Sequence, residues 1–258
     1  MKTILSYDGT FTGFLTCVFT TYEEKLEVVD IQQEQRATEL LFSQLQNIIT
    51  DEAKAARVAL AIKERCSAAG RRNLYRAFLS EEPGIELTML KYLQYVFKSK
   101  HQIDSDYSNP QVLKIAQTAK KVGREKHRME AFIRFKLTKD QIYFACIEPD
   151  FNVLPLIQEH FKKRYADQAW IIYDIARKYG LYYDLQEVNQ IALQFNQDIY
   201  INTSNGKALD PKEIEFQQLW QQYFTSTNIA SRKNTKLHLQ HVPRRYWKYL
   251  SEKSLLHN

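Results

Sequence analysis

The sequence has little of what usually marks a linker, a membrane span or an export signal. Only 7 glycines and 6 prolines occur in 258 residues, so long disordered linkers are not expected. No apolar run approaches the roughly 20 residues that a membrane-spanning helix needs. The opening MKTILSYDGT turns polar too early for a signal peptide. We therefore expect a cytoplasmic protein without a membrane partner.

Cysteine is also scarce, and its spacing excludes several kinds of chemistry. Cys17, Cys66 and Cys146 are far apart and form no CxxC pair, so reduced thiols are expected rather than disulfides or a zinc site. The sequence also lacks the spaced cysteine triplet of a radical-SAM enzyme. Neither the glycine pattern of a phosphate-binding loop nor the HxE…PCxxC pattern of zinc deaminases is present. The sequence thus predicts no metal and no cofactor of its own.

Positive charge is plentiful but unevenly placed. The formal net charge is +6 at pH 7. Residues 114–136 hold eight Lys/Arg against two Asp/Glu, and residues 226–258 hold seven against one. The rest of the chain is therefore net acidic. Clustering of this kind indicates a polyanionic partner better than the total charge does.

Hydrophobic periodicity predicts strands and one helix at the start of the chain, followed by a block of helices. Thr50 is expected to be the N-cap of the first helix of this block, because acids follow it directly. Residues 51–131 would then form a helical insert between strands. The expected strands are 3–7, 27–31 and 45–49, and the expected helices are 11–25, 53–66, 72–79, 85–98 and one that begins at Pro110.

The second half of the chain alternates short strands with a helix. The expected elements are a β-hairpin (131–135 with 142–147), a helix (152–165), strands (170–174, 181–183, and one from 188 to 193 or 195) and a short final helix from Pro243. Together these patterns predict a single α+β domain over residues 1–258. Its sheet should be mainly antiparallel and backed by helices, with the helical block between strands.

The helix that begins at Pro110 has one basic side. Lys121, Arg124 and Arg128 lie away from its apolar stripe, and only two acids interrupt the run of cations. Such a face is often no more than a solvated surface. It is equally consistent with contact to the phosphates of a nucleic acid, and the sequence leaves the two interpretations open.

The closing segment, residues 226–258, combines cations with aromatic residues. Cations neutralise phosphates and aromatic rings stack on exposed bases, so the combination favours nucleic-acid binding. The alternative is a short helix docked through Tyr246, Trp247 and Leu250 with its charges in water, and both can hold at once. The predicted contact residues are Arg232, Lys233, Lys236, His238, His241, Arg244 and Arg245.

One acidic cluster allows a catalytic interpretation. Glu148, Asp150 and Asn152 follow a predicted strand and precede a predicted helix. An acid there could activate water, with His127 from the basic helix as its partner. The simpler interpretation, which we favour, is that Asp150 or Asn152 caps the helix. Whether the protein is an enzyme stays open.

Four stretches of the chain resemble a known family. They are SYDGTFTGFLTCVF (6–19), AFLSEEPG (77–84), the segment from Arg124 to Asp184, and RKNTKLHLQHVPRRYWKYL (232–250). The family is a bacterial one of DNA-repair or DNA-metabolism proteins built on a domain of unknown function. Members resemble a domain fused to uracil-DNA-glycosylase-like domains, or encoded beside a radical-SAM protein assigned to DNA modification or repair. The resemblance implies DNA as the ligand and one of these proteins as the partner.

Three functions therefore compete. The leading hypothesis is a protein of DNA repair or DNA metabolism that contacts nucleic acid through its two basic blocks. The second is a nucleic-acid-modifying enzyme, glycosylase-like or a hydrolase, with a site near His127 and Asp150. The third is an adaptor whose basic surface binds an acidic protein. Turnover on modified DNA would separate the second hypothesis from the first.

Overall fold

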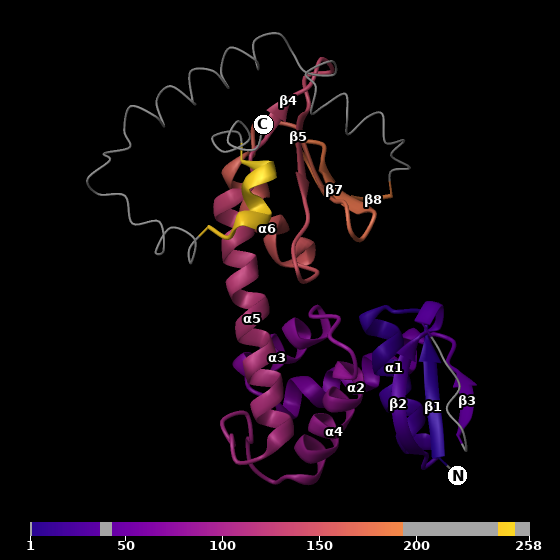
Figure 1. Ribbon diagram of the computed structural model, residues 1–258. Coiled ribbons are helices and arrows are strands. Elements are labelled where there is room, and N and C mark those ends of the chain that lie inside the picture. Colours follow the sequence, from indigo (N-terminus) through magenta and orange to yellow (C-terminus); the bar gives the residue numbers. More distant parts are fainter. Residues whose placement is uncertain (1, 37–42, 193–241, 251–258) are drawn as a thin grey trace. The chain divides into compact units, whose positions relative to one another are not determined.

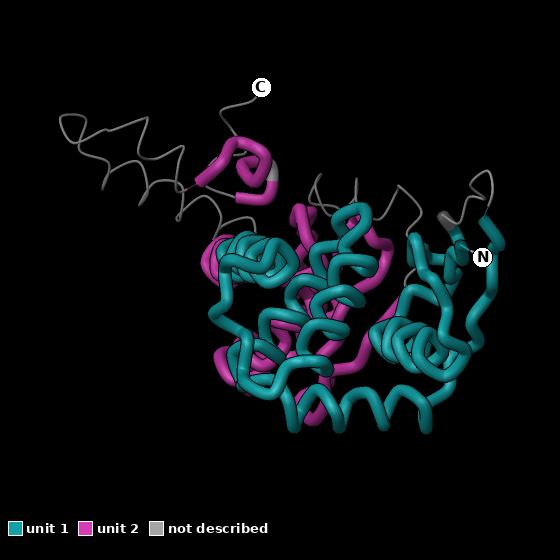
Figure 2. Tube along the Cα trace, turned by 90° about the horizontal axis from the view of Figure 1, so that it is seen from below, with its two compact units in different colours: residues 1–124 teal, residues 125–258 magenta. Residues whose placement is uncertain are grey.

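The computed structural model of the chain describes residues 2–36, 43–192 and 242–250 (Figure 1). The chain divides into two compact units, residues 1–124 and 125–258, which Figure 2 shows in different colours. Helix α5, Pro110–Phe132, begins in the first unit and ends in the second. One continuous helix thus belongs to both units.

The N-terminal unit contains a small sheet and several helices. Its elements are β1 (Lys2–Tyr7), α1 (Phe11–Glu23), β2 (Glu27–Gln33), the 3-10 helix η1 (Glu34–Arg36), β3 (Gln44–Asn47), α2 (Glu52–Arg65), α3 (Ala68–Phe78) and α4 (Ile85–Lys98). The strands are parallel, in the order β2-β1-β3, and the central strand β1 is almost wholly buried. A turn at Gly9, with a φ of 82°, leads into α1, whose first turn is capped by the Thr10 hydroxyl.

The core of the N-terminal unit is built from the apolar stripes of its helices and from buried residues of strands β1 and β2. Met89 and Leu93 of α4 and Ile115 of α5 are among its fully enclosed side chains. Tyr7, at the end of β1, donates its hydroxyl to Glu86 at 3.2 Å. The buried carboxylate of Glu86 on α4 is therefore hydrogen-bonded inside the N-terminal unit.

The C-terminal unit combines a five-stranded sheet with helices. Its elements are β4 (Lys136–Leu137), β5 (Tyr143–Ile147), α6 (Leu154–Arg164), β6 (Trp170–Asp174), β7 (Tyr179–Tyr183), β8 (Val188–Ile191) and the 3-10 helix η3 (Arg244–Tyr249). The strand order is β4-β5-β6-β7-β8, and only β5 and β6 are parallel, with α6 between them in the chain. The fully buried Trp170 packs against Tyr183 and Phe161, with ring centroids 5.5 and 6.2 Å away.

The predicted α+β class is confirmed, with a mainly antiparallel sheet in the C-terminal unit and a helical block between strands. The strands on either side of the helical block belong to two separate sheets, and the N-terminal one is parallel. No described helix is both long and apolar enough to cross a membrane. That residues 1–258 form a single domain stays a prediction.

Two local predictions are wrong. The N-cap of α2 is Asp51, which accepts the Lys54 N–H at 3.0 Å, while Thr50 donates its hydroxyl to Asp8 at 2.7 Å. The first strand of the predicted hairpin, 131–135, is also wrong, because α5 continues to Phe132 and the strand that pairs with β5 is β4, Lys136–Leu137. Alternating apolar residues at the end of a helix cannot be told from a strand by pattern alone.

Candidate nucleic-acid interface

The site is built around Glu125, a carboxylate on the buried side of helix α5. Its side chain is 1% exposed. The backbone N–H of Asp150 donates to it at 3.0 Å, and guanidinium nitrogens of Arg245 and Arg128 lie 3.2 and 3.4 Å away. The Tyr246 hydroxyl donates to the same carboxylate. A buried carboxylate is costly without such donors, so the network accounts for its position.

Helix η3 is held against α5 by apolar side chains. Tyr246 and Leu250, which follows the helix directly, are each 2% exposed. The ring centroid of Tyr246 lies 5.7 Å from that of Phe132 at the end of α5. Figure 1 shows η3 in yellow beside this end of α5. Arg244 and Arg245, at the start of η3, are exposed, whereas Tyr246 and Leu250 are buried.

The connection between β5 and α6 presents Asp150 to η3. Its carboxylate lies 2.5 Å from the Arg245 guanidinium. Arg177 fixes the backbone of this connection by donating to the carbonyls of Pro149 at 3.1 Å and Asp150 at 3.3 Å. The fully buried Asp174 in turn accepts from Arg177 at 3.0 Å. Burial raises the pKa of the Asp174 carboxyl, and the Arg177 charge opposes that rise.

Two groups of the Glu125 network have shifted pKa values. Burial and the hydrogen bond to Glu125 raise the pKa of the Tyr246 hydroxyl, so it stays protonated at neutral pH. Burial alone would lower the pKa of the Arg245 guanidinium, but the hydrogen bond with Tyr246 and the charges of Glu125 and Asp150 raise it. Both groups therefore keep the proton that their contact with Glu125 requires.

A small hollow lies where η3 meets the ends of α5 and β5. It is lined by Met129, Phe132, Ile133, Cys146, Ile147, Glu148, Tyr246 and Tyr249. The Tyr249 hydroxyl donates to the Glu148 carboxylate at 2.8 Å. Cys146 is a poor nucleophile, because burial raises the pKa of its thiol to about 12. The walls of the hollow are thus mostly apolar, with one carboxylate among them.

The predicted cap of helix α6 is wrong. The N-cap position is occupied by Val153 without a side-chain hydrogen bond, and Pro155 in the first turn has no N–H to be capped. Asp150 pairs with Arg245 instead, and Asn152 accepts a tyrosine hydroxyl at 2.5 Å. The side chains of Asp150 and Asn152 bind residues far away in the sequence, so neither of them caps the helix.

The predicted catalytic residues His127 and Asp150 have different partners. The side chain of His127 is 87% exposed, and its Nδ1 atom lies 4.0 Å from the Glu130 carboxylate. Asp150 is engaged by Arg245. In the part of the chain that the structure describes, His127 and Asp150 share no hydrogen bond or ion pair. The catalytic hypothesis gains no geometric support and stays a prediction.

The predicted basic side of α5 is partly neutralised. Lys114 and Lys121 both bind the carboxylate of Glu82, at 2.7 and 3.0 Å. Arg128 pairs with the buried carboxylate of the network, and Arg124 is exposed. The net charge of residues 114–136 therefore overstates the free positive charge on this helix, because Glu82 lies outside that window.

The predicted C-terminal contact residues are only partly described. Arg244 is exposed, with its guanidinium 6.0 Å from the centroid of the Trp247 ring, whereas Arg245 is paired with carboxylates. Among the described residues no group of acids, histidines and cysteines could hold a metal ion. The remaining predicted contacts lie outside the described residues, namely Arg232, Lys233, Lys236, His238 and His241.

Sequence reasoning missed Glu125 as the centre of this site. In the sequence it interrupts a run of cations and resembles surface charge. Its position, three residues after Val122 and four before Met129, places it on the apolar stripe of the helix. That spacing is the signal that could have marked it as buried, because an acid on an apolar stripe needs a buried donor.

Comparison with known proteins gives one family match. The family model described as a domain of unknown function, DUF4130, matches residues 83–252. This range is most of the chain, and it includes α5, the residues that line the hollow, and η3. No curated protein matches the chain.

Proposed function

The chain belongs to the family of the domain of unknown function DUF4130, and on that premise we propose that it is a nucleic-acid-binding protein of DNA repair or DNA metabolism. The proposed contact surface is the C-terminal segment, residues 226–258. Its ligand is DNA. The resemblance set out above supports the link to DNA, and the chemistry of the segment supports the binding.

One observation carries the proposal: Arg244 is exposed at the start of a short helix whose other side is buried. Tyr246 and Leu250 are each 2% exposed and hold the helix in place. The Arg244 guanidinium lies near the half-buried ring of Trp247. A cation beside an aromatic ring on a docked helix suits a phosphate and the base attached to it.

The C-terminal segment supports this proposal better than α5 does. It holds seven Lys/Arg against one Asp/Glu, so most of its cations have no acid nearby in sequence. On α5, Lys114 and Lys121 are already bound by Glu82. A lysine must give up its ion pair with a carboxylate before it binds a phosphate, so it adds less to the affinity for DNA than an unpaired cation does. We therefore assign α5 a minor part in binding.

The proposal includes a partner and a location. A radical-SAM protein or a uracil-DNA-glycosylase-like protein would supply the chemistry, and this rests on the family resemblance alone. Co-purification with a radical-SAM protein encoded beside it would support this pairing. The proposed location is the cytoplasm, which the free cysteines Cys17, Cys66 and Cys146 support because reducing compartments keep thiols unpaired.

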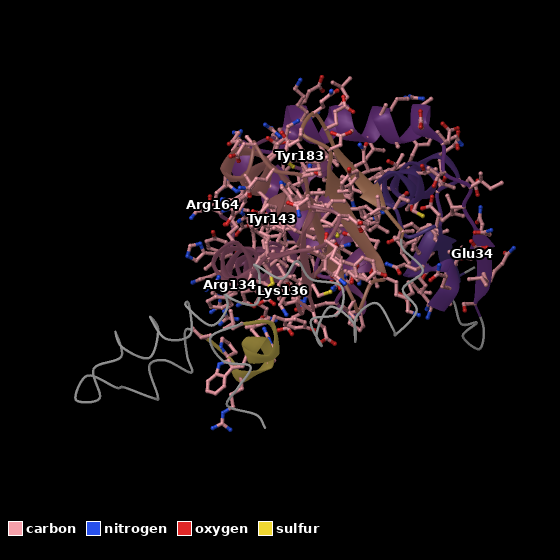
Figure 3. All side chains as sticks on the ribbon, turned by 90° about the horizontal axis from the view of Figure 1, so that it is seen from above. Glu34, Arg134, Lys136, Tyr143, Arg164 and Tyr183 are labelled. Atoms are coloured by element: carbon pink, nitrogen blue, oxygen red, sulfur yellow. The ribbon has the colours of Figure 1, made fainter. Side chains whose placement is uncertain are left out.

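A charge reversal with a matched control tests the proposal. Fluorescence anisotropy would compare DNA binding by wild type, Arg244→Glu and Arg164→Glu. Arg164 is a fitting control because it is also exposed, at the end of α6, with its guanidinium 5.9 Å from an aromatic ring (Figure 3). We expect Arg244→Glu to weaken binding about tenfold, the effect of roughly 1.4 kcal/mol, and Arg164→Glu to change it less than twofold.

If both variants lost the same DNA affinity, only the net charge of the protein would matter. The C-terminal segment would then no longer be assigned as the DNA-binding surface. Arg245 is left intact in this test. It pairs with two carboxylates, so a glutamate there would place like charges together and disturb the fold. A double reversal of Arg244 and Arg245 would therefore confuse binding with stability.

A further inference from the structure

We infer that helix η3 is held by a polar clasp, and that Glu125, the buried member of the clasp, positions Arg244 of η3 for contact with nucleic acid. The second half of this inference rests on the proposed function, and the first half does not. The clasp consists of the carboxylates Glu125, Glu148 and Asp150 and of the η3 side chains that bind them, Arg245, Tyr246 and Tyr249.

The three carboxylates bind three side chains of η3, and two of them share Arg245. Tyr249 donates to Glu148 at 2.8 Å, and Arg245 lies 2.5 Å from Asp150. Glu125 is bound by the Tyr246 hydroxyl and by Arg245. The three acids come from the end of α5 and from the connection between β5 and α6, so η3 is tied to two separate elements.

Glu125 is the strongest of the three attachments. Its side chain is 1% exposed, whereas Asp150 is 46% exposed and Glu148 lies at the surface. Ion pairs open to water contribute little, while hydrogen bonds to a buried charge are strengthened by the low local dielectric. Removal of η3 would also leave Glu125 without two of its donors. The buried contact therefore dominates the attachment.

A helix as short as η3 needs such an attachment. Short 3-10 helices have poor hydrogen-bond geometry and little stability of their own. Within η3 the Tyr246 N–H bonds to the Pro243 carbonyl and the Leu250 N–H to the Trp247 carbonyl, each at 3.1 Å. These two amides can be protected only while the helix stays docked, so they report directly on the clasp.

Amide hydrogen exchange measured by NMR on the full chain tests the inference. Glu125→Gln removes the buried charge, and Tyr246→Phe removes the hydroxyl while keeping the ring against Phe132. Glu130→Gln is the matched control, because Glu130 lies on the same helix, is 14% exposed and binds Lys126 at 2.6 Å rather than η3. These changes separate the clasp from the rest of α5.

We expect the amides of Tyr246 and Leu250 to exchange about tenfold faster in both clasp variants, the effect of losing one hydrogen bond to a charged group. The control should change these rates less than twofold. Amides of strand β6 should keep their wild-type rates in all three variants. Unchanged rates at Tyr246 and Leu250 in both clasp variants would overturn the inference, and so would equal acceleration in β6, which would indicate a general loss of stability. If the Glu125→Gln variant does not fold, the exchange rates of the Tyr246→Phe variant alone test the inference.

DNA affinity of the same variants separates the clasp from the proposed function. Weaker binding by both clasp variants, with binding by Glu130→Gln unchanged, would support both halves of the inference. Faster exchange in the clasp variants with no DNA binding even by wild type would leave the clasp in place and remove the proposed function. Faster exchange with unaltered DNA affinity would overturn the positioning role of Glu125.

Discussion

At the scale of single residues, the main feature of the site is that carboxylates are buried and hydrogen-bonded to arginines. Glu125 and Asp174 are 1% and 0% exposed, and each is bonded to an arginine. A carboxylate is tolerated inside a protein when donors replace water, and loss of one donor leaves the charge under-satisfied. The two acids therefore fix Arg245 and Arg177 more firmly than exposed ion pairs could. Among the described residues no acid is paired with Arg244, so we propose it as the residue that contacts a ligand.

The cysteines give a prediction at the same scale. Burial raises the pKa of Cys17 and Cys146 to about 12, and it raises the pKa of Cys66 as well. At pH 8 a thiol with a pKa of about 12 is ionised in roughly one molecule in 10,000, and only the thiolate reacts quickly. The folded protein should therefore react slowly with a chromogenic disulfide reagent at pH 8, and faster as the pH rises.

Addition of guanidinium chloride should release three fast-reacting thiols at pH 8. The measurement is the absorbance change on mixing, with and without denaturant. One or more thiols that react within seconds in the native protein would contradict the raised pKa values of these cysteines.

At the scale of elements, hydrophobic periodicity predicted whether a segment is a helix or a strand better than it predicted the residues at which the element begins and ends. The helices expected at 11–25 and 85–98 are found at Phe11–Glu23 and Ile85–Lys98. The cap of α2 was misplaced by one residue, because Thr50 and Asp51 are both good capping residues. Only the backbone decides between them, and Asp51 has the extended φ of −122° and ψ of 110° that a cap needs.

Helix α5 provides a pH-dependent prediction. Hydrogen bonds from Lys114 and then Lys121 lower the pKa of Glu82. A lowered folded-state pKa adds stability above the pKa of an unfolded glutamate, about 4.3, and this stability is lost as the pH falls through the folded value. Glu82→Gln should therefore lower the free energy of unfolding at pH 7 by at most about 1 kcal/mol, since the pair is partly exposed.

The difference between wild type and Glu82→Gln should shrink below pH 4. Urea denaturation at pH 7 and at pH 3.5 measures it. Glu64→Gln, an exposed acid on α2, is the control and should show little change at either pH. A difference that grows on acidification would mean that the lysines do not stabilise the Glu82 carboxylate.

At the scale of the whole molecule, charge partners far apart in sequence were beyond prediction. Glu82 lies 32 and 39 residues before the lysines that it binds, and Arg245 lies 120 residues after Glu125. Counting charges within a short window of the sequence therefore reveals neither of these contacts. The basic blocks were visible in the sequence, but which of their cations are already neutralised depends on tertiary contacts.

We propose that the two compact units unfold as one domain, because α5 serves both of them. It contributes Ile115 to the core of the N-terminal unit and Met129 to the hollow of the C-terminal unit. Trp170 and Trp247 are the described tryptophans, and both belong to the C-terminal unit, so their fluorescence reports on that unit. Far-UV circular dichroism also reports on the helices α1 to α4 of the N-terminal unit.

Unfolding curves in urea should therefore coincide when followed by fluorescence and by circular dichroism. Two separated midpoints would contradict the single-domain prediction and would show that the units are stable independently of each other.

The central claim is that this chain binds nucleic acid through phosphate contacts, and the most direct measurement is the salt dependence of DNA binding by the wild-type protein. Fluorescence anisotropy with single- and double-stranded DNA would be recorded from about 50 to 300 mM salt. Each neutralised phosphate contributes a slope of about −0.9 on duplex DNA in a plot of log affinity against log salt concentration. We predict binding with a slope of about −3 or steeper. No binding at the lowest salt, or an affinity that salt does not change, would contradict the account.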